Sequence, residues 1–278
     1  MRNFELDYCK LVSGVLEHGD VRPSRAGETT SVFGAILTID CLERGRFPIL
    51  TQRKIFTRGV LGELAAFLRG ATDLQTFKDL GCPYWDANAK AWPPNKGIDP
   101  SMQRVGRIYG AHWRHWTGLD HTYDQLESLV RNLQQEPFSR RHLLTTYNPA
   151  ELQDACLPPC HLLAQFNVRT DKHLDCIVTM RSVDLCLGLP SDIMLYAALM
   201  LLLCNETGYA PGKLTFMMGD AHVYRNHTEV FLEHQQRPMH ELPTFKLPAS
   251  ASINNFVAAD LELINYTHSG VLNYEFNV

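Results

Sequence analysis

The sequence lacks several features that would place it in a specialised class of protein. Its eight cysteines form no CxxC pair, and it contains no internal repeat and no low-complexity tract. The net charge of -4 argues against a surface that binds nucleic acid. The N-terminus carries acidic residues where a signal peptide needs an apolar core. We therefore expect free thiols in a cytoplasmic protein, with most cysteines acting as small buried hydrophobes.

The chain also lacks an apolar run of the length that crosses a bilayer, which takes about 20 residues. Its longest such run, 193–204, is too short, and we expect a buried core helix there. Hydrophobic residues make up 45% of the 278 residues and charged residues 20%, an ordinary balance for a globular domain. Because no linker-like segment divides the chain, we expect one domain over residues 1–278.

Apolar spacing predicts both helices and strands. Helical periodicity marks 1–20, 57–70 and 123–137, with a closing glycine in the second segment and Pro137 ending the third. Two short apolar segments around a polar turn, 161–169 and 174–181, are typical of a β-hairpin, and a further strand is expected over 213–224. This mixture predicts an α+β fold.

The segment LPPCH places Cys160 after two prolines and before His161. Proline fixes the backbone, and a stiff loop suits a nucleophile. The alternative is a buried cysteine beside a turn, since free cysteine is among the most buried residue types.

Two pairs of residues offer groups that suit phosphate oxygens. Arg140 and Arg141 are adjacent, and Arg181 precedes Ser182. Guanidinium groups bind phosphate through paired donors, and a hydroxyl adds another. The alternative for each pair is a solvated charged surface.

His222 and Tyr224 stand two residues apart in an expected strand, so both would point to the same face. Such a pair could bind a sugar hydroxyl, and a structural histidine is the alternative. A metal site made by His222 and His227 is poorly supported, because their spacing matches no common ligand pattern.

Asp192 follows Ser191 at the start of the long apolar run. Serine and aspartate before a helix are typical of an N-cap, and an acidic group there suits the helix dipole. The alternative is that the carboxylate contacts a ligand. The local pattern alone favours capping.

These motifs, in this order, resemble those of the thymidylate synthase family. The resemblance implies an α+β fold with a mixed sheet packed against helices and one sheet face at a homodimer interface. It also implies 5,10-methylenetetrahydrofolate as co-substrate and a nucleotide substrate, with no metal and no membrane or nucleic-acid partner. The matching segments are SVFG (31–34), GELAAFLRG (62–70), YWD (84–86), IYGAHWRHW (108–116), SRR (139–141), LPPCH (157–161), MRSVDLCLGLP (180–190), GDAHVYRNH (219–227) and a C-terminal valine.

The resemblance assigns catalytic roles at the pyrimidine. Cys160 would add to C6 as a thiolate, which makes C5 electron-rich toward the one-carbon unit. Glu63 would organise water and proton transfers at the 4-position, and Tyr109 would lie near the C5 proton. Asp192 would contact the base.

The resemblance also assigns binding residues. Arg140 and Arg141 would reach the phosphate of the other subunit's nucleotide, which implies a homodimer. Because the N-terminal loop is one residue shorter than usual, Arg25 is the first choice for its phosphate ligand and Arg22 the second. The further nucleotide ligands would be Arg181 and Ser182 at the phosphate and His222 and Tyr224 at the sugar 3′-hydroxyl. The folate side would comprise Arg53, Trp85, Asp184, Leu187, Gly188 and Val278, with Asp184 hydrogen-bonding the pterin.

The main departure from the family is PSD at 190–192, where its members usually have PFN. The family's asparagine recognises uracil by donating to the 4-oxo group and accepting from the ring N–H. Cytosine reverses this pattern, so a carboxylate would accept from its 4-amino group, with one shared proton completing the second bond. A mismatched buried contact costs about 1–3 kcal/mol. Asp192 resembles the aspartate of phage deoxycytidylate hydroxymethylases and predicts dCMP as substrate, in a host cytoplasm if the chain is phage-encoded.

The product depends on whether the closed site excludes water. Trp85 and Val278 match shielding residues and favour 5-methyl-dCMP, which we expect, whereas Asn88 and Ser191 thin the apolar folate pocket and favour 5-hydroxymethyl-dCMP. Further alternatives are CMP as substrate, an atypical thymidylate synthase acting on dUMP, and a non-catalytic nucleotide- or RNA-binding relative. The intact Cys160 argues against the last.

Overall fold

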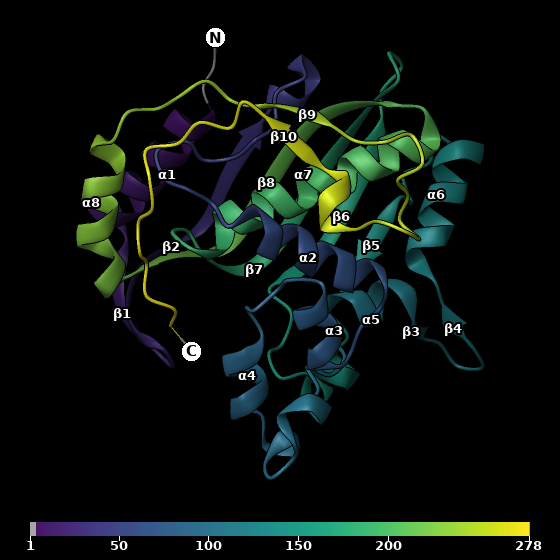
Figure 1. The fold of residues 1–278 in the computed structure, drawn as a ribbon, viewed down its shortest axis with the longest axis horizontal. Coiled ribbons are helices and arrows are strands. Elements are labelled where there is room, and N and C mark those ends of the chain that lie inside the picture. The colour runs from purple at the N-terminus through teal and green to yellow at the C-terminus, as the bar shows by residue number, and fades with distance from the viewer. Residues whose placement is uncertain (1–3, 278) are drawn as a thin grey trace.

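A six-stranded sheet forms the main layer of the molecule. The computed structural model describes residues 4–277, so Val278 lies outside the described residues. The strand order is β1-β2-β8-β7-β6-β5 (Figure 1), and within this order only β7 and β8 are parallel. The strands are β1 (Asp20–Ser24), β2 (Gly27–Ile39), β5 (Leu143–Thr145), β6 (His161–Val168), β7 (His173–Asp184) and β8 (Ala210–Tyr224).

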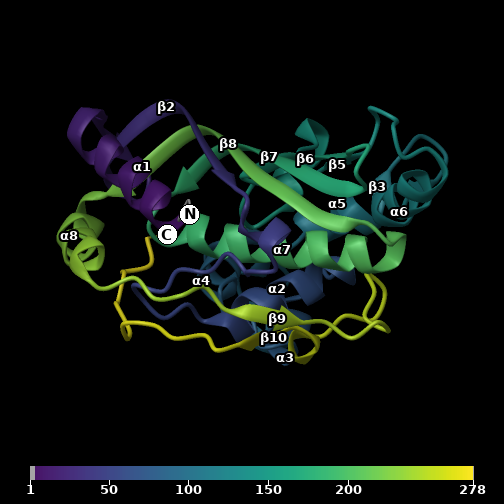
Figure 2. The same ribbon diagram turned by 90° about the horizontal axis from the view of Figure 1, so that it is seen from above.

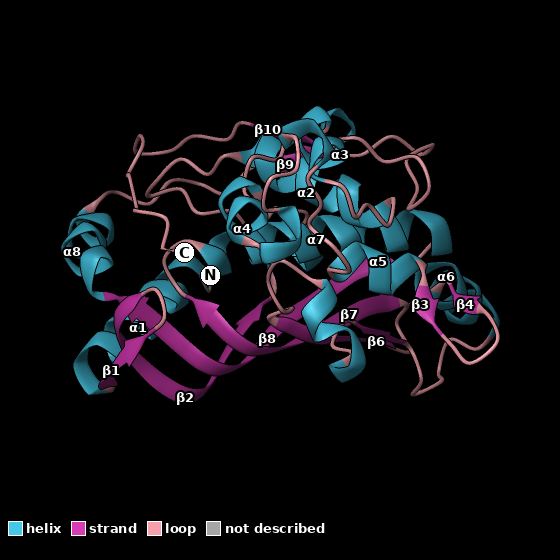
Figure 3. Cartoon of the chain, turned by 90° about the horizontal axis from the view of Figure 1, so that it is seen from below, coloured by secondary structure: helices cyan, strands magenta, loops and turns pink. Residues whose placement is uncertain are grey.

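Helices and a small hairpin lie in layers on one side of this sheet. Helix α7 runs directly beneath the strands, and α2 and the β9–β10 hairpin lie beyond it (Figures 2 and 3). The helices are α1 (Phe4–His18), α2 (Thr57–Leu68), α3 (Leu74–Asp79), α4 (Asp86–Ala91), α5 (Tyr109–Arg114), α6 (Gln125–Gln135), α7 (Gly188–Thr207) and α8 (Thr228–Gln236). Two short hairpins are β3 (Trp116–Thr117) with β4 (Thr122–Tyr123), and β9 (Thr244–Lys246) with β10 (Glu262–Ile264).

The structure confirms the α+β class and the main elements that periodicity predicts. Helices α1, α2 and α6 occupy the three predicted helical segments, and β6 and β7 form the predicted antiparallel hairpin. The chain reverses between them through Lys172, whose φ is 63°. Apart from Ala111, the buried hydrophobic residues within 4–277 form one cluster, which supports the proposal of a single domain.

Helix α7 is longer than the apolar run in the sequence indicates. It begins at Gly188 and has 20 residues, so by length and composition alone it could cross a membrane, and the expectation that this segment is too short was wrong. The expectation of a core helix is confirmed, because its residues from Ile193 to Cys204 are all buried. Pro190 is accommodated because it lies in the first turn, where the helix needs no N–H donor.

Candidate active site

Cys160 lies in the loop that leads into β6. Its backbone N–H donates to the hydroxyl oxygen of Tyr109 at 2.9 Å, and Tyr109 is the first residue of α5. Arg181, on β7, donates from Nε to the carbonyl of Pro159 and from Nη2 to that of Pro158, both at 2.8 Å. The same Nη2 lies 3.5 Å from Cys160 Sγ. The stiff proline loop is therefore anchored by the arginine that also contacts the sulfur.

Burial raises the pKa of the Cys160 thiol above its usual range. The positive charge of Arg181 lowers this pKa and the charge of Asp192 raises it. Arg181 thus favours the thiolate, as expected, but burial has the larger effect on the pKa. The fraction of Cys160 present as thiolate increases as the pH rises. Because the thiolate is the nucleophile, the reactivity of Cys160 should increase with it.

Glu63, on α2, shares a hydrogen bond with Trp85. The indole Nε1–H donates to Glu63 Oε1 at 2.7 Å. Burial raises the pKa of Glu63 to about 8; the bond from Trp85 lowers it and the nearby charge of Asp192 raises it. Glu63 therefore holds a proton at neutral pH and can donate it. The sequence assigns Trp85 to the folate side alone, and its bond to Glu63 was missed.

Asp192 does not cap α7, so the interpretation that the local pattern favours is wrong. The helix begins at Gly188, which places Asp192 beyond its first turn. The turn before the helix is instead held by Asp184, whose Oδ1 accepts from the backbone N–H groups of Cys186 at 2.8 Å and Leu187 at 3.2 Å. The Asp192 carboxylate is thereby left for another contact.

That contact is a chain of buried polar groups next to Cys160. Asp192 Oδ1 lies 3.0 Å from His161 Nε2, and His161 Nδ1 lies 3.2 Å from the Tyr196 hydroxyl. The His161 ring also packs against Tyr109, with centroids 4.7 Å apart. His161 and Tyr196 were not predicted as site residues. Their signal was present: His161 adjoins the nucleophile, and Tyr196 stands four residues after Asp192, on the same helix face.

The N-terminal hairpin separates the two arginine candidates for phosphate. Arg22 Nη2 forms an ion pair with Asp220 Oδ2 at 2.8 Å and also bonds the Ser31 hydroxyl. Arg25 is exposed and close enough to Tyr224 to lower that phenol's pKa, although burial raises it overall. Within the described part of the chain Arg22 forms an ion pair and Arg25 does not, which supports the first choice made from the sequence.

Arg140 and Arg141 precede Cys160 by about 20 residues, and among the described residues no hydrogen bond or ion pair joins them to the Cys160 cluster. Both are exposed on the loop between α6 and β5, beside the exposed Phe138. This loop lines a cavity of about 600 Å³. Within residues 4–277 neither guanidinium forms an ion pair, which leaves both available to a ligand outside this chain.

The sugar-side pair lies on one face of β8, as its spacing predicts. The rings of His222 and Tyr224 meet edge to face with centroids 5.2 Å apart. His222 Nδ1 lies 3.1 Å from Asp220 Oδ1, so His222 presents Nε2 to a ligand. Asp220 was missed, although it stands two residues before His222 on the same strand face. Ser182 pairs with Asp220 across β7 and β8, which places the phosphate and sugar candidates side by side.

The folate-side candidates gather at the β7–α7 turn. Arg53 is buried, donates from Nη2 to the carbonyl of Cys186 at 2.6 Å, and lies 4.9 Å from the Tyr274 ring centre. Its Nε is buried and has no hydrogen-bond partner among the residues that the structure describes. Leu187 and Gly188 are half-buried beside this turn. A half-buried carboxylate at Asp184, an apolar turn and a guanidinium with a spare donor fit a pterin ring and its carboxylate-bearing tail.

Ser191 and Asn88 are the two residues expected from the sequence to admit water to the site. The Ser191 hydroxyl bonds back to the carbonyl of Leu187 at 3.2 Å, within its own helix. Asn88 is buried in α4. The Ser191 hydroxyl is therefore engaged within α7, and burial limits the contact of Asn88 with solvent.

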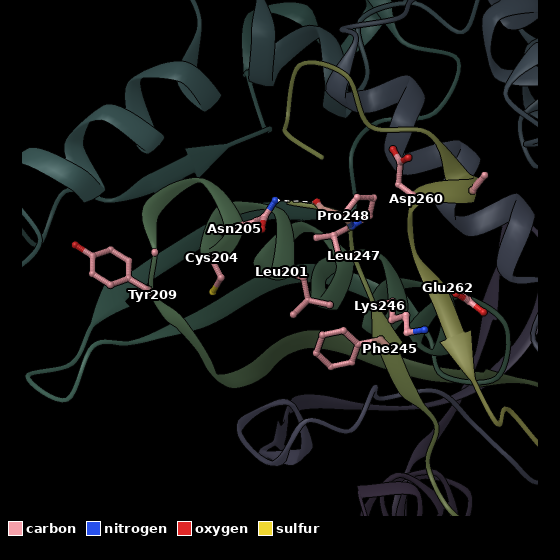
Figure 4. A pocket seen from close by; sticks show the side chains of 12 residues that line it. Leu201, Cys204, Asn205, Tyr209, Phe245, Lys246, Leu247, Pro248, Asp260 and Glu262 are labelled. Carbon is pink, nitrogen blue, oxygen red and sulfur yellow. Dashed lines mark hydrogen bonds between the residues drawn. The ribbon is translucent and has the colours of Figure 1, made fainter. Parts of the chain in front are cut away.

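A cavity of about 920 Å³ lies elsewhere, at the C-terminal end of α7 (Figure 4). Leu201, Asn205 and Lys246 are among its lining residues, and none of the predicted site residues is. We place the site at the Cys160 cluster because the titratable groups and the hydrogen-bonded nucleophile converge there.

A thymidylate synthase family model matches residues 6–278. The chain is 39% identical over 279 residues to "Thymidylate synthase 1/2" of Encephalitozoon cuniculi, which covers 95% of the chain and 94% of that protein. It is 35% identical over 283 residues to "Thymidylate synthase" of Zymomonas mobilis, with 94% and 95% covered. It is also 36% identical over 288 residues to "Bifunctional dihydrofolate reductase-thymidylate synthase" of Leishmania major; there it covers 99% of the chain but spans only about half, 55%, of that relative.

Proposed function

The chain belongs to the thymidylate synthase family, and from this premise we propose that it transfers a one-carbon unit to C5 of dCMP. The family is one of folate-dependent transferases that act on pyrimidine nucleotides, with 5,10-methylenetetrahydrofolate as co-substrate and no metal requirement. The observation that carries the choice of dCMP is the position of Asp192, which does not cap its helix and lies in the Cys160 cluster.

One carboxylate oxygen of Asp192 contacts His161, and the other could accept a hydrogen bond from a ligand. Oδ1 lies against His161 Nε2, and a Cβ placed on Gly188 would stand 3.9 Å from Oδ2. If Tyr196 donates to His161 Nδ1, the ring proton sits on Nε2 and Asp192 accepts it. Oδ2 then remains an acceptor, which suits the 4-amino group of cytosine and opposes the 4-oxo group of uracil.

Glu63 supplies the complementary proton. Its raised pKa, about 8, keeps it protonated at neutral pH, so it can donate toward the base while Asp192 accepts. With Glu63 as the donor and Asp192 as the acceptor, the two carboxyl groups would form the pair of contacts that cytosine requires.

The remaining residues of the cluster position the substrate and the nucleophile. Cys160 would bond to C6, with Arg181 beside the sulfur and Tyr109 holding the loop backbone. Arg25 and Ser182 would bind the phosphate, with His222 and Tyr224 at the 3′-hydroxyl. Bound 5,10-methylenetetrahydrofolate would supply the one-carbon unit and, for methyl formation, the hydride.

We propose 5-methyl-dCMP as the product. Ser191 is bonded to its own helix backbone and Trp85 to Glu63, so neither brings a free polar group that would order water beside C5. Hydroxymethyl-dCMP remains the second candidate, because a carboxylate at 192 in place of an amide makes the pocket more polar.

We propose that two chains pair through the outer sheet face, as the homodimeric character of the family implies. Phe216 on β8 packs against Tyr196 of α7, so its neighbour Met217 and the cross-strand partner Ile36 lie on the opposite face, where both are exposed, as is Ile177 on β7. An exposed apolar sheet face is costly in water and is relieved by pairing. Arg140 and Arg141 would then reach the partner's phosphate site.

The decisive experiment compares dCMP, CMP and dUMP as substrates of the purified chain with 5,10-methylenetetrahydrofolate. We expect the highest kcat/KM with dCMP and a product heavier by one methyl group in mass spectrometry. Faster turnover of dUMP would show an atypical thymidylate synthase, which the names of the relatives favour. A hydroxymethyl product without dihydrofolate absorbance would overturn the methyl assignment, and binding without turnover would indicate a non-catalytic relative.

A further inference from the structure

Asp184, Cys186 and His227 bring three different metal-binding groups together beside the folate-side turn. Their carboxylate oxygen, sulfur and ring nitrogen all lie within 4.8 Å of one another. Asp184 ends β7, Cys186 stands in the turn to α7, and His227 ends the 3-10 turn after β8. Cys186 and His227 are fully buried, and Asp184 is half-buried, so of the three groups the carboxylate is the one in contact with solvent.

The orientation of the His227 ring points to a ligand. Its Nε2 lies 2.7 Å from the backbone carbonyl of Glu275 and 3.2 Å from Asn277 Nδ2; we assign the proton to Nε2 because the contact with the carbonyl, which can only accept, is the shorter one. Among residues 4–277 its buried Nδ1 has no hydrogen-bond partner, and it lies 3.7 Å from Asp184 Oδ1. Metal-bound imidazoles are held in this way, with the distal N–H donated to a carbonyl and the free nitrogen directed at the cation.

We propose that a divalent cation of the Zn²⁺ class binds Asp184, Cys186 and His227, with water as a fourth ligand. Oxygen, nitrogen and thiolate sulfur together suit Zn²⁺ better than Mg²⁺ or Ca²⁺, which take oxygen. Zinc bonds of about 2.0–2.3 Å place ligand atoms roughly 3.5 Å apart, so the widest pairs must approach by about 1 Å. Asp184 Oδ1 accepts from the N–H groups of Cys186 and Leu187, so the cation would take the other carboxylate oxygen, Oδ2, while Oδ1 keeps those two bonds.

The positive charge of Arg53 repels a cation at this cluster, and the negative charges of two ligands reduce that repulsion. Its Nη2 donates to the Cys186 carbonyl at 2.6 Å, so one positive charge stays close to the cluster. A carboxylate and a thiolate contribute two negative charges. The cation and Arg53 together therefore exceed the ligands by one positive charge, which predicts reversible binding rather than a permanent structural ion.

Such binding would inhibit the enzyme. A cation that holds Asp184 removes the carboxylate proposed to bind the pterin, so folate and metal would compete. This consequence rests on the proposed folate role of Asp184, whereas binding of the cation does not.

Cobalt titration tests the metal site without any activity measurement. It uses Cys160→Ala protein, so that the nucleophilic thiol cannot contribute. We expect one Co²⁺ per chain with a thiolate-to-cobalt charge-transfer band, lost in Cys186→Ala and weakened at least about 10-fold in Asp184→Asn. Cys204→Ala, another buried cysteine, should keep the band, and circular dichroism checks that each variant folds. No band, or a band that survives Cys186→Ala, would overturn the proposal.

Zinc inhibition of the active chain then separates the two proposals. We expect inhibition that folate relieves, a chelator reverses and Cys186→Ala reduces by about 10-fold or more. If cobalt binds as expected but zinc inhibition is indifferent to folate, the metal site stands and the folate role of Asp184 fails. If dCMP is turned over but cobalt does not bind, only the metal site fails.

Discussion

Asp192→Asn keeps the shape of the side chain and removes its charge, which makes it the sharpest test of substrate choice. The amide oxygen can still accept from His161 Nε2, 3.0 Å away in the native chain, so its N–H₂ group turns toward the base. With dCMP that group meets the 4-amino group, donor against donor. A mismatched buried contact costs about 1–3 kcal/mol, so kcat/KM for dCMP should fall by about 5- to 150-fold.

The same change should help dUMP, whose 4-oxo group accepts from the amide. If both effects are of similar size and add, the dCMP-to-dUMP preference moves by roughly 30- to 20,000-fold. Steady-state kinetics with each nucleotide at saturating folate measure this ratio, with products identified by mass spectrometry. Asp260→Asn is the matched control, because Asp260 makes its hydrogen bond to Val257 in the loop before β10. An unchanged ratio in Asp192→Asn, or a native preference for dUMP, would refute the reasoning.

Three further predictions concern the same site. Asp192 raises the pKa of Cys160, and activity should increase as the pH rises through that pKa. Asp192→Asn should therefore move the rising limb of the pH–kcat/KM profile to lower pH. A limb that stays in place or moves to higher pH contradicts this coupling. Tyr196→Phe leaves His161 Nδ1 without its donor, so we expect a loss of about 1–3 kcal/mol in unfolding free energy by chemical denaturation and a reduced preference for dCMP, whereas a purely structural role would leave the preference intact. If Arg141 binds the partner's nucleotide, Arg141→Ala and Cys160→Ala chains, each inactive alone, should recover about a quarter of native activity per total chain when they are refolded together. Roughly half of the chains are then in mixed dimers, each of which has one intact site. No recovery would place Arg141 in its own chain's site.

Local sequence features were sufficient wherever a short segment decides its own structure. The periodicity of 123–137 predicts α6, and the polar turn between two apolar segments predicts the β6–β7 hairpin. The spacing of His222 and Tyr224 places them on one strand face because side chains alternate along a strand. The LPPCH segment indicates a stiff mount for Cys160, which its contacts support.

Contacts between distant segments could not be read in this way. The bond from Trp85 to Glu63 spans 22 residues, and the ion pair of Arg22 with Asp220 spans 198. In neither pair does the sequence around one residue indicate which distant residue it contacts. Nor does one chain's sequence show what Arg140 and Arg141 contact, since the proposed ligand belongs to the partner.

The start of α7 shows the division most clearly. The sequence by itself determined that an apolar helix occupies 193–204 and that an acid stands at 192 in place of the family's amide. Only the tertiary structure decided what that acid does. Asp184 anchors the turn before the helix, the helix begins at Gly188, and His161 arrives from β6 to meet the carboxylate. The turn before Gly188 decides where α7 begins, and the side chain that holds this turn comes from the end of β7, beyond the local pattern around Asp192.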